Sequence, residues 1–157
     1  MVIYNKKAKF NYNLLDRFEA GIALNGKEVK AAKKGSVDLS NSFVKIIDNE
    51  IYLVNANFGI TDPDIATTRA RKLLVHKRQI YSLLTETKAK KLTLVPTKLY
   101  NKPGLRSGSR KSRIFKLEVA LAKGKKEFDK KESKKRKDIE RDVEREIRGT
   151  KDNDARR

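Results

Sequence analysis

The first 122 residues contain several stretches in which apolar and polar residues alternate, a pattern typical of half-buried β-strands. Residues 10–24 alternate over a length too great for one straight strand, and Gly21 lies where a barrel strand could bend. Residues 114–123 alternate as clearly, with one face formed by Phe115, Leu117, Val119 and Leu121. The first part of the chain is therefore predicted to be mostly β.

Two further segments predict strands with a defined turn or irregularity. The runs FVKII and IYLVN flank Asp48-Asn49-Glu50 and predict a β-hairpin. The run at residues 92–100 contains Pro96, which has no backbone N–H for a ladder hydrogen bond, so an edge or a bulge is expected there. Residues 101–113 are rich in turn formers and basic residues and predict a long exposed loop.

Two helices are predicted between the strands. Residues 27–34 form a short helix that ends at Gly35, because glycine readily adopts the left-handed conformation that closes a helix. Residues 71–86 form a longer helix with one apolar stripe. The stripe consists of Leu73, Leu74, Ile80, Leu83 and Leu84. Short strands with a packed helix indicate a small closed barrel such as an OB-fold, and an open α+β sheet is the alternative.

Residues 123–157 differ from residues 1–122 in composition. The first 122 residues hold 24 basic and 10 acidic residues, and the last 35 hold 15 and 10. Sizeable apolar residues are rare after residue 122, namely Phe128, Ile139, Val143 and Ile147. So little burial cannot offset the entropy of ordering a segment. We therefore predict a folded body, residues 1–122, and a basic tail, residues 123–157, that is disordered or a latent helix capped by Asp129 and Glu132.

Charge and composition narrow the class of protein. The chain of 157 residues has a formal net charge of +19, with 38% apolar and 38% charged residues. This balance excludes an enzyme with a large dry core, and no apolar run approaches the length that spans a bilayer. The chain lacks cysteine and has one histidine, which disfavours a metal site or a Ser-His-Asp triad. We expect a cytoplasmic protein with a polyanionic partner.

Basic clusters are the strongest candidate chemistry, because cations replace the counterions condensed on a phosphate backbone. The clusters are Lys6/Lys7/Lys9, Lys30/Lys33/Lys34, Arg69/Arg71/Lys72, Arg110/Lys111/Arg113 and Lys123/Lys125/Lys126. They favour a nucleic-acid partner. Asp62 and Asp64 flank a proline and indicate a turn, with a Mg²⁺-dependent nuclease as a remote alternative.

Four segments, in order along the chain, resemble one known family. They are EAGIALNGKEVKAAKKGS at residues 19–36, RARKLLVHKRQI at 69–80, LTLVPTKLY at 92–100 and VALAKGKKEFDKKESKKRKDIERD at 119–142. These segments are similar to the small protein B (SmpB) family, the SsrA-binding proteins of bacteria. The similarity extends over nearly the whole chain.

The resemblance implies a fold and a function. The fold is mostly β: an OB-fold-like antiparallel β-barrel with flanking helices and a basic C-terminal tail. The function is that of an RNA-binding adaptor, which binds the tRNA-like domain of transfer-messenger RNA (SsrA RNA) and delivers it to stalled ribosomes. The tail then enters the empty mRNA channel and decoding centre, against ribosomal RNA. Catalysis, cofactors, metals, small-molecule substrates and membranes have no part in this function.

The resemblance also implies which residues carry the function. The expected RNA-binding residues are Glu28, Val29, Lys30, Lys33, Lys34, Arg71, Lys72, His76, Lys77, Lys123, Lys125 and Lys126. The expected decoding-centre residues of the tail are Asp129, Lys130, Lys131, Ile139, Val143 and Ile147. Lys131 stands where the family motif has arginine. For Glu28, a purely local cap or ion pair is an equally good interpretation. For the whole chain, the alternative is a structural ribosomal protein that binds ribosomal RNA permanently.

Overall fold

The computed structural model describes residues 1–60, 66–103, 113–132, 134–139 and 141. The chain divides into two compact units, Met1–Gly124 and Lys125–Arg157. Several predictions lie outside the described residues. They concern the pair Asp62 and Asp64, most of the loop predicted at residues 101–113, and the tail residues Val143 and Ile147.

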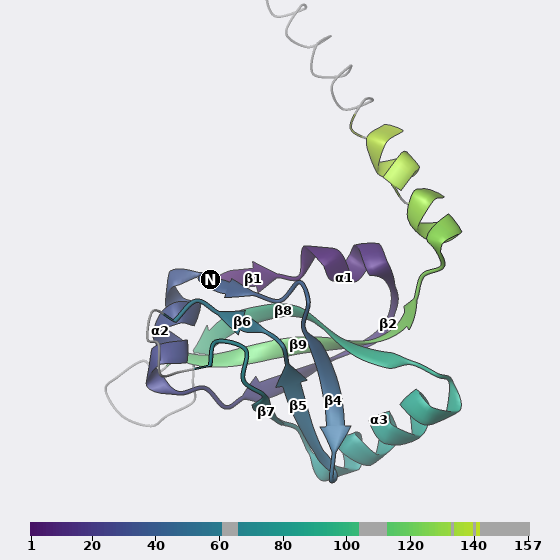
Figure 1. Cartoon of the computed structure of the whole chain (residues 1–157). Helices are drawn as coiled ribbons and strands as arrows, with labels where there is room; N and C mark the ends of the chain where they lie inside the picture. The colour runs from purple at the N-terminus through teal and green to yellow at the C-terminus, as the bar shows by residue number, and fades with distance from the viewer. Residues whose placement is uncertain (61–65, 104–112, 133, 140, 142–157) are drawn as a thin grey trace, which may run out of the picture. The chain divides into compact units, whose positions relative to one another are not determined.

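In the described part of the first unit, seven strands form one antiparallel sheet (Figure 1). Their order is β1 (Val2–Tyr4), β8 (Thr93–Pro103), β4 (Phe43–Ile47), β5 (Glu50–Val54), β7 (Arg71–Leu74), β2 (Tyr12–Ile22) and β9 (Arg113–Gly124). Strand β8, the neighbour of the edge strand β1, also pairs with β9 along its length, so the sheet closes on itself between these two strands. The strands from β8 round to β9 therefore close an antiparallel barrel, which confirms the OB-fold-like prediction. A separate small sheet pairs β3 (Val37–Asp38) with β6 (Asn57–Phe58).

The predicted hairpin and the predicted bulge are both confirmed. Strands β4 and β5 pair with Ile47 opposite Glu50, across a two-residue turn. Asp48 and Asn49 in that turn both have positive φ, 50° and 58°, as a type I′ turn requires. The register of β8 against β9 shifts next to Pro96, where the proline cannot donate a ladder hydrogen bond.

The core fills the interior of the barrel. Strand β9 contributes the side chains that its alternation predicts, Phe115, Leu117, Val119 and Leu121. The opposite face of β9 also buries Ala120 and Ala122. Ala122 belongs to a second, small cluster with Ala8 and Val95, so part of the outer barrel surface is covered by the segment that carries Ala8.

That segment is helix α1 (Lys6–Asn11), which together with β1 is absent from the sequence prediction. Six residues are too few for helical periodicity to show, and Phe10 fitted the alternation of the strand that follows. Asn5 starts the helix, since its side-chain oxygen accepts a hydrogen bond from the Ala8 N–H at 3.1 Å. Strand β2 then begins at Tyr12 and shifts its register against β9 between Leu14 and Arg17.

Helix α2 (Gly26–Lys34) matches the prediction within one residue. It ends at Gly35, whose φ of 77° is the left-handed conformation that glycine adopts without steric cost. The helix predicted over residues 71–86 is wrong in its first turn. Residues Arg71–Leu74 form strand β7, and helix α3 (Lys77–Ala89) begins only at Lys77.

The pairing of β7 explains this error. Leu73 lies opposite Ile22 of β2 and Ile51 of β5, and its side chain is buried between them. Leu74 points outward and is exposed. Adjacent leucines fit either a helical stripe or a strand, so only the barrel decides between the two.

In the second unit, residues 127–132, 134–139 and 141 are helical. The carboxylate of Asp129 accepts a hydrogen bond from the backbone N–H of Lys126 at 3.3 Å. Asp129 therefore lies inside the first turn, and its carboxylate accepts from the N–H of Lys126, the residue just before the helix. The prediction that Asp129 is itself the N-cap is wrong. The side chains of Phe128 and Ile139 are exposed within this unit.

Candidate nucleic-acid interface

Helix α2 presents a fixed group of cations. Ala31 and Ala32 face the core, whereas the predicted interface residues Lys30, Lys33 and Lys34 are exposed. Lys33 and Lys34 lie in the last turn, where the helix dipole favours positive charge. The helix thus displays three ammonium groups from a rigid backbone, with Val29 half-buried at its side.

Glu28 of the same helix does not lie on the surface. Its side chain is fully buried, and it forms a reciprocal capping box with Asn25. The Asn25 side chain accepts a hydrogen bond from the Glu28 N–H, and the Glu28 carboxylate accepts one from the Asn25 N–H, each at 2.8 Å. The structure thus shows the local interpretation of Glu28, and this placement removes the residue from the candidate contact surface.

Two arginines complete the surroundings of Glu28. Arg69 donates from Nε and Nη2 to the two carboxylate oxygens at 2.7 and 2.6 Å. Arg71 donates from Nε to Oε1 at 2.9 Å. The bond from Arg71 joins the start of α2 to β7, since Arg71 lies 43 positions after Glu28 in the chain. Glu28 is therefore a positioning residue for the lysine-bearing helix.

Arg71 is buried as completely as Glu28. Its guanidinium donates to the carbonyl oxygens of Ala56, Thr67 and Arg69 at 2.8 to 2.9 Å. It also lies over the ring of Phe58, 3.9 Å from the centroid. With every group directed inward, Arg71 is inconsistent with the predicted contact to RNA.

The pKa values of this cluster follow from its surroundings. Burial alone would raise the pKa of the Glu28 carboxyl, but hydrogen bonds from Arg69 and Asn25 and the charge of Arg71 hold that pKa below its usual value. Burial lowers the pKa of Arg71, while Glu28 opposes that shift. Since arginine has an intrinsic pKa far above neutrality, Glu28 and its two arginines are all ionised at pH 7.

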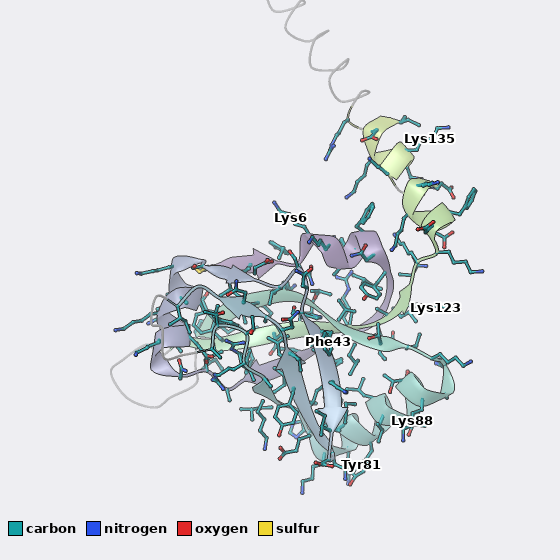
Figure 2. All side chains as sticks on the ribbon, viewed as in Figure 1. Lys6, Phe43, Tyr81, Lys88, Lys123 and Lys135 are labelled. Carbon is teal, nitrogen blue, oxygen red and sulfur yellow. The ribbon has the colours of Figure 1, made fainter. Side chains whose placement is uncertain are left out.

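The remaining predicted residues of the first unit lie on its surface. Lys72 projects outward from β7 and pairs with Glu50 of β5, which raises the pKa of Lys72. His76 is exposed before α3 and makes no side-chain capping hydrogen bond. Lys77 is exposed at the start of α3. Lys123 is exposed near the end of β9, where Figure 2 labels it.

In the second unit, the predicted residues are also solvent-facing to different degrees. Lys126, Lys131 and Ile139 are exposed, whereas Lys125, Asp129 and Lys130 are partly covered within the unit. The helix therefore combines cationic side chains with one exposed isoleucine. The helical ion pairs Glu132–Arg136 and Asp138–Arg141 stay on its surface.

Two carboxylates that the sequence analysis did not single out organise cations on the barrel exterior. Glu19 of β2 contacts Tyr100, Lys102 and Lys116 from β8 and β9. Partial burial and the Glu19 charge raise the pKa of Tyr100 to about 12.

Glu118 of β9 makes the corresponding contacts at another position. It pairs with Lys98 at 2.9 Å and Arg17 at 3.7 Å, and it accepts a hydrogen bond from the Thr97 hydroxyl at 2.7 Å. The outward positions of the alternating strands were the only sequence signal for these groups.

The described residues meet the requirements of neither a metal site nor a membrane-spanning helix. Among them, no group of three or more histidine, cysteine, aspartate or glutamate side chains is placed to hold a metal ion. None of the described helices is long and apolar enough to cross a membrane. The prominent chemistry of the described surface is therefore cationic.

Fold and surface together define a small, strongly basic β-barrel protein. The model of the family "SmpB protein" matches residues 2–149. An SsrA-binding protein from Mycoplasma mycoides subsp. mycoides is 40% identical, over 89% of this chain and 92% of the relative. One from Sulfurihydrogenibium sp. is 42% identical over 95% of each chain. The chain belongs to the SmpB protein family.

A solved structure agrees with this assignment. The structure described as "tmRNA-SmpB: a journey to the center of the bacterial ribosome" contains a chain with a TM-score of 0.61 to this one. The two chains are 38% identical, and the match covers 80% of this chain and 85% of the other.

Proposed function

We propose that this protein is an RNA-binding adaptor of trans-translation that binds the tRNA-like domain of transfer-messenger RNA and delivers it to stalled ribosomes. The observation that carries the proposal is the similarity to SsrA-binding proteins over 89% to 95% of this chain, together with the likeness to a chain of the tmRNA-SmpB structure. The protein acts in the cytoplasm, and it contributes binding and positioning rather than catalysis.

The first unit holds the RNA mainly through its phosphates. Duplex RNA exposes few base edges to side chains, so its recognition depends on shape, phosphates and 2′-hydroxyls. Lys30, Lys33 and Lys34 on α2 supply charge from a helix that the buried Glu28 cluster holds in place. Lys72 and Lys123 add exposed cations on two strands of the barrel.

The second unit acts at the ribosome. Lys130 and Lys131 supply charge for ribosomal RNA in the decoding centre, and Asp129 stabilises the first turn of the helix. The exposed Ile139 offers an apolar contact along the mRNA channel, and Val143 and Ile147, which follow in the sequence at intervals of four, offer further ones. Lys125 and Lys126 lie at the start of this unit and bind RNA phosphates.

The dependence of affinity on salt tests the binding mode. Because phosphate neutralisation releases counterions, the affinity for a tRNA-like RNA falls steeply as salt concentration rises. A triple substitution of Lys30, Lys33 and Lys34 to glutamine makes this dependence shallower. Binding that is insensitive to salt contradicts the proposal.

The division of labour between the units has its own test. Removing residues 129–157 leaves RNA affinity intact and abolishes rescue of a ribosome stalled on an mRNA without a stop codon. In the full-length chain, Lys130→Gln with Lys131→Gln reduces rescue in the same direction. Recovery of the protein in one-to-one ratio with a ribosomal subunit, without transfer-messenger RNA, supports a structural ribosomal protein instead.

A further inference from the structure

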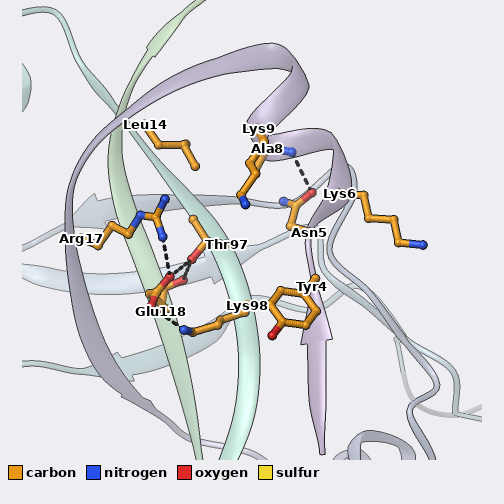
Figure 3. Close-up of a pocket in the computed structure, with 10 residues that line it drawn as sticks. All are labelled: Tyr4, Asn5, Lys6, Ala8, Lys9, Leu14, Arg17, Thr97, Lys98 and Glu118. Carbon is orange, nitrogen blue, oxygen red and sulfur yellow. Dashed lines mark hydrogen bonds and ion pairs between the residues drawn. The ribbon is translucent and has the colours of Figure 1, made fainter. Parts of the chain in front are cut away.

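A cavity of about 290 Å³ opens on the barrel exterior beside helix α1. Residues from β1, α1, β2, β8 and β9 line it, as Figure 3 shows. Its walls are largely apolar, with Ala8 and Leu14 on one side and the ring of Tyr4 on another. Its volume is close to the lower end of the range for small-ligand pockets, about 300 Å³, so it can hold one small group.

Two irregularities of the barrel coincide at this cavity. The register of β2 against β9 shifts between Leu14 and Arg17, and that of β8 against β9 shifts between Pro96 and Lys98. Bulges re-aim side chains and occur preferentially near functional sites. Here they direct Arg17 and Lys98 from opposite sides toward Glu118.

The corner between β1 and α1 is fixed in advance. Asn5 is buried, and its side-chain amide donates to the carbonyl oxygens of Leu39 and Pro96, each at 2.9 Å. The same side chain accepts from Ala8 N–H. The flanking residues Tyr4 and Lys6 therefore project from a rigid backbone, and Tyr4 is 66% exposed at the rim.

The charge around the cavity is strongly positive. Its lining includes the cations Lys6, Lys9, Arg17 and Lys98 and the single carboxylate Glu118. Glu118 keeps two of these cations, Arg17 and Lys98, beside the opening without neutralising the rim as a whole. An aromatic ring beside cations, over an apolar wall, is the combination that binds a base and its phosphate.

We infer that this cavity binds one unpaired nucleotide of the tRNA-like RNA. The base stacks on Tyr4 and enters between Ala8 and Leu14, while its phosphates lie against Lys6 and Arg17. The inference rests on the proposed function, since it places part of the same RNA on a second surface of the first unit. An unpaired base of that RNA would then contribute to binding through stacking, in addition to the phosphate contacts.

Substitution of Tyr4 in the full-length chain tests the inference. Tyr4→Leu weakens binding of the tRNA-like RNA about tenfold, since one base–aromatic stack is lost. Tyr4→Phe keeps the ring and binds within about twofold of the wild type. Tyr81→Leu is the matched control, because Tyr81 is 55% exposed on α3 and does not line the cavity. Unchanged melting temperatures exclude misfolding as the cause.

Two further readouts are independent of that affinity ratio. Near-ultraviolet crosslinking of thiouridine-substituted tRNA-like RNA labels the peptide containing Tyr4. Lys6→Gln reduces the slope of log affinity against log salt by about 0.7, the value for one phosphate of a single strand. Lys88→Gln on α3 is the control for general loss of charge.

The outcomes separate the cavity from the proposed function. If wild type and Tyr4→Leu bind the RNA with equal affinity and Tyr4 forms no crosslink, the inferred nucleotide site is wrong. The proposed function is not affected by that result. A wild-type protein that does not bind the tRNA-like RNA overturns the proposed function itself. If polyglutamate shifts the NMR signals of the Tyr4 ring and the RNA does not, the cavity binds acidic peptide and the inference is wrong.

Discussion

The first unit contains two sites of similar composition and opposite environment. Glu28 lies between Arg69 and Arg71, and Glu118 lies between Arg17 and Lys98. In the first site the carboxylate and one arginine are completely buried. In the second, the side chain of Arg17 is 49% exposed and that of Lys98 is 32% exposed.

This difference decides what each site can do. Buried charges have lost their hydration, so every hydrogen-bond position in the Glu28 site must be satisfied by the protein itself. That requirement ties α2 to β7 and directs the hydrogen-bonding groups of Glu28 and Arg71 to the protein itself, and only Arg69, whose side chain is 38% exposed, brings this site into contact with solvent. The cations around Glu118 keep contact with water, which a phosphate can replace. Ion pairs of like composition thus hold the fold in one place and prepare a binding surface in another.

The largest expected effect is that of Glu28→Gln. Removing this charge leaves Arg71 buried without its partner, and such a loss destabilises a protein by about 3–5 kcal/mol. Urea unfolding followed by circular dichroism measures the change. The same denaturation curves for Glu118→Gln provide the matched control, and a smaller loss for Glu28→Gln than for Glu118→Gln would show that the comparison is wrong.

Acid weakens the contrast in stability between wild type and Glu28→Gln. Because the folded-state pKa of Glu28 lies below the usual value for a glutamate, its stabilisation is complete above that usual value and is lost as the pH falls through the lower, folded pKa. The stability difference between the two proteins therefore shrinks in strongly acidic solution. Unfolding measured from neutral to acidic pH checks this, and a difference that is independent of pH contradicts it.

Asn25→Ala separates the capping role from the ion pairs. The substitution removes the cap from the first turn of α2 but leaves both arginines on Glu28, so we expect a loss of about 1 kcal/mol. Urea unfolding of the full-length chain measures it. Asn25→Ser keeps an accepting oxygen and serves as the control. A loss as large as that of Glu28→Gln would mean that the cap, and not the ion pair, anchors the helix.

Local chemistry made much of the barrel predictable. The end of α2 at Gly35, the Asp48-Asn49 turn, the bulge at Pro96 and the alternation of β9 each depend on a few adjacent residues. What failed depends on distant ones. Arg71 and Lys72 are neighbours in a basic cluster, but the fate of Arg71 is set by Glu28, 43 positions away. No local pattern distinguishes a cation that pairs in the core from one that faces solvent.

In the candidate interface, too, the features set by neighbouring residues could be predicted and those set by distant residues could not. The lysines of α2 could be placed on a surface because helical spacing separates them from the buried alanines. The cavity beside α1 could not be foreseen, since it requires two register shifts and a six-residue helix to meet in space. Closure of the barrel brings these parts together, and the sequence shows only the separate strands.

The smallest expected effect is that of Glu118→Gln. Its cations remain hydrated, and part of the attraction is screened by salt, so we expect a loss of stability below about 1 kcal/mol that diminishes as salt is added. Affinity for the tRNA-like RNA does not fall, because the substitution removes a negative charge from a cationic surface. Unfolding at low and high salt, with RNA titration of the same protein, measures both. Glu118→Asp keeps the charge and serves as the control. If RNA affinity falls for Glu118→Gln, then Glu118 holds Arg17 and Lys98 in a geometry that the RNA requires, and the exposed site resembles the buried one more closely than their burial indicates.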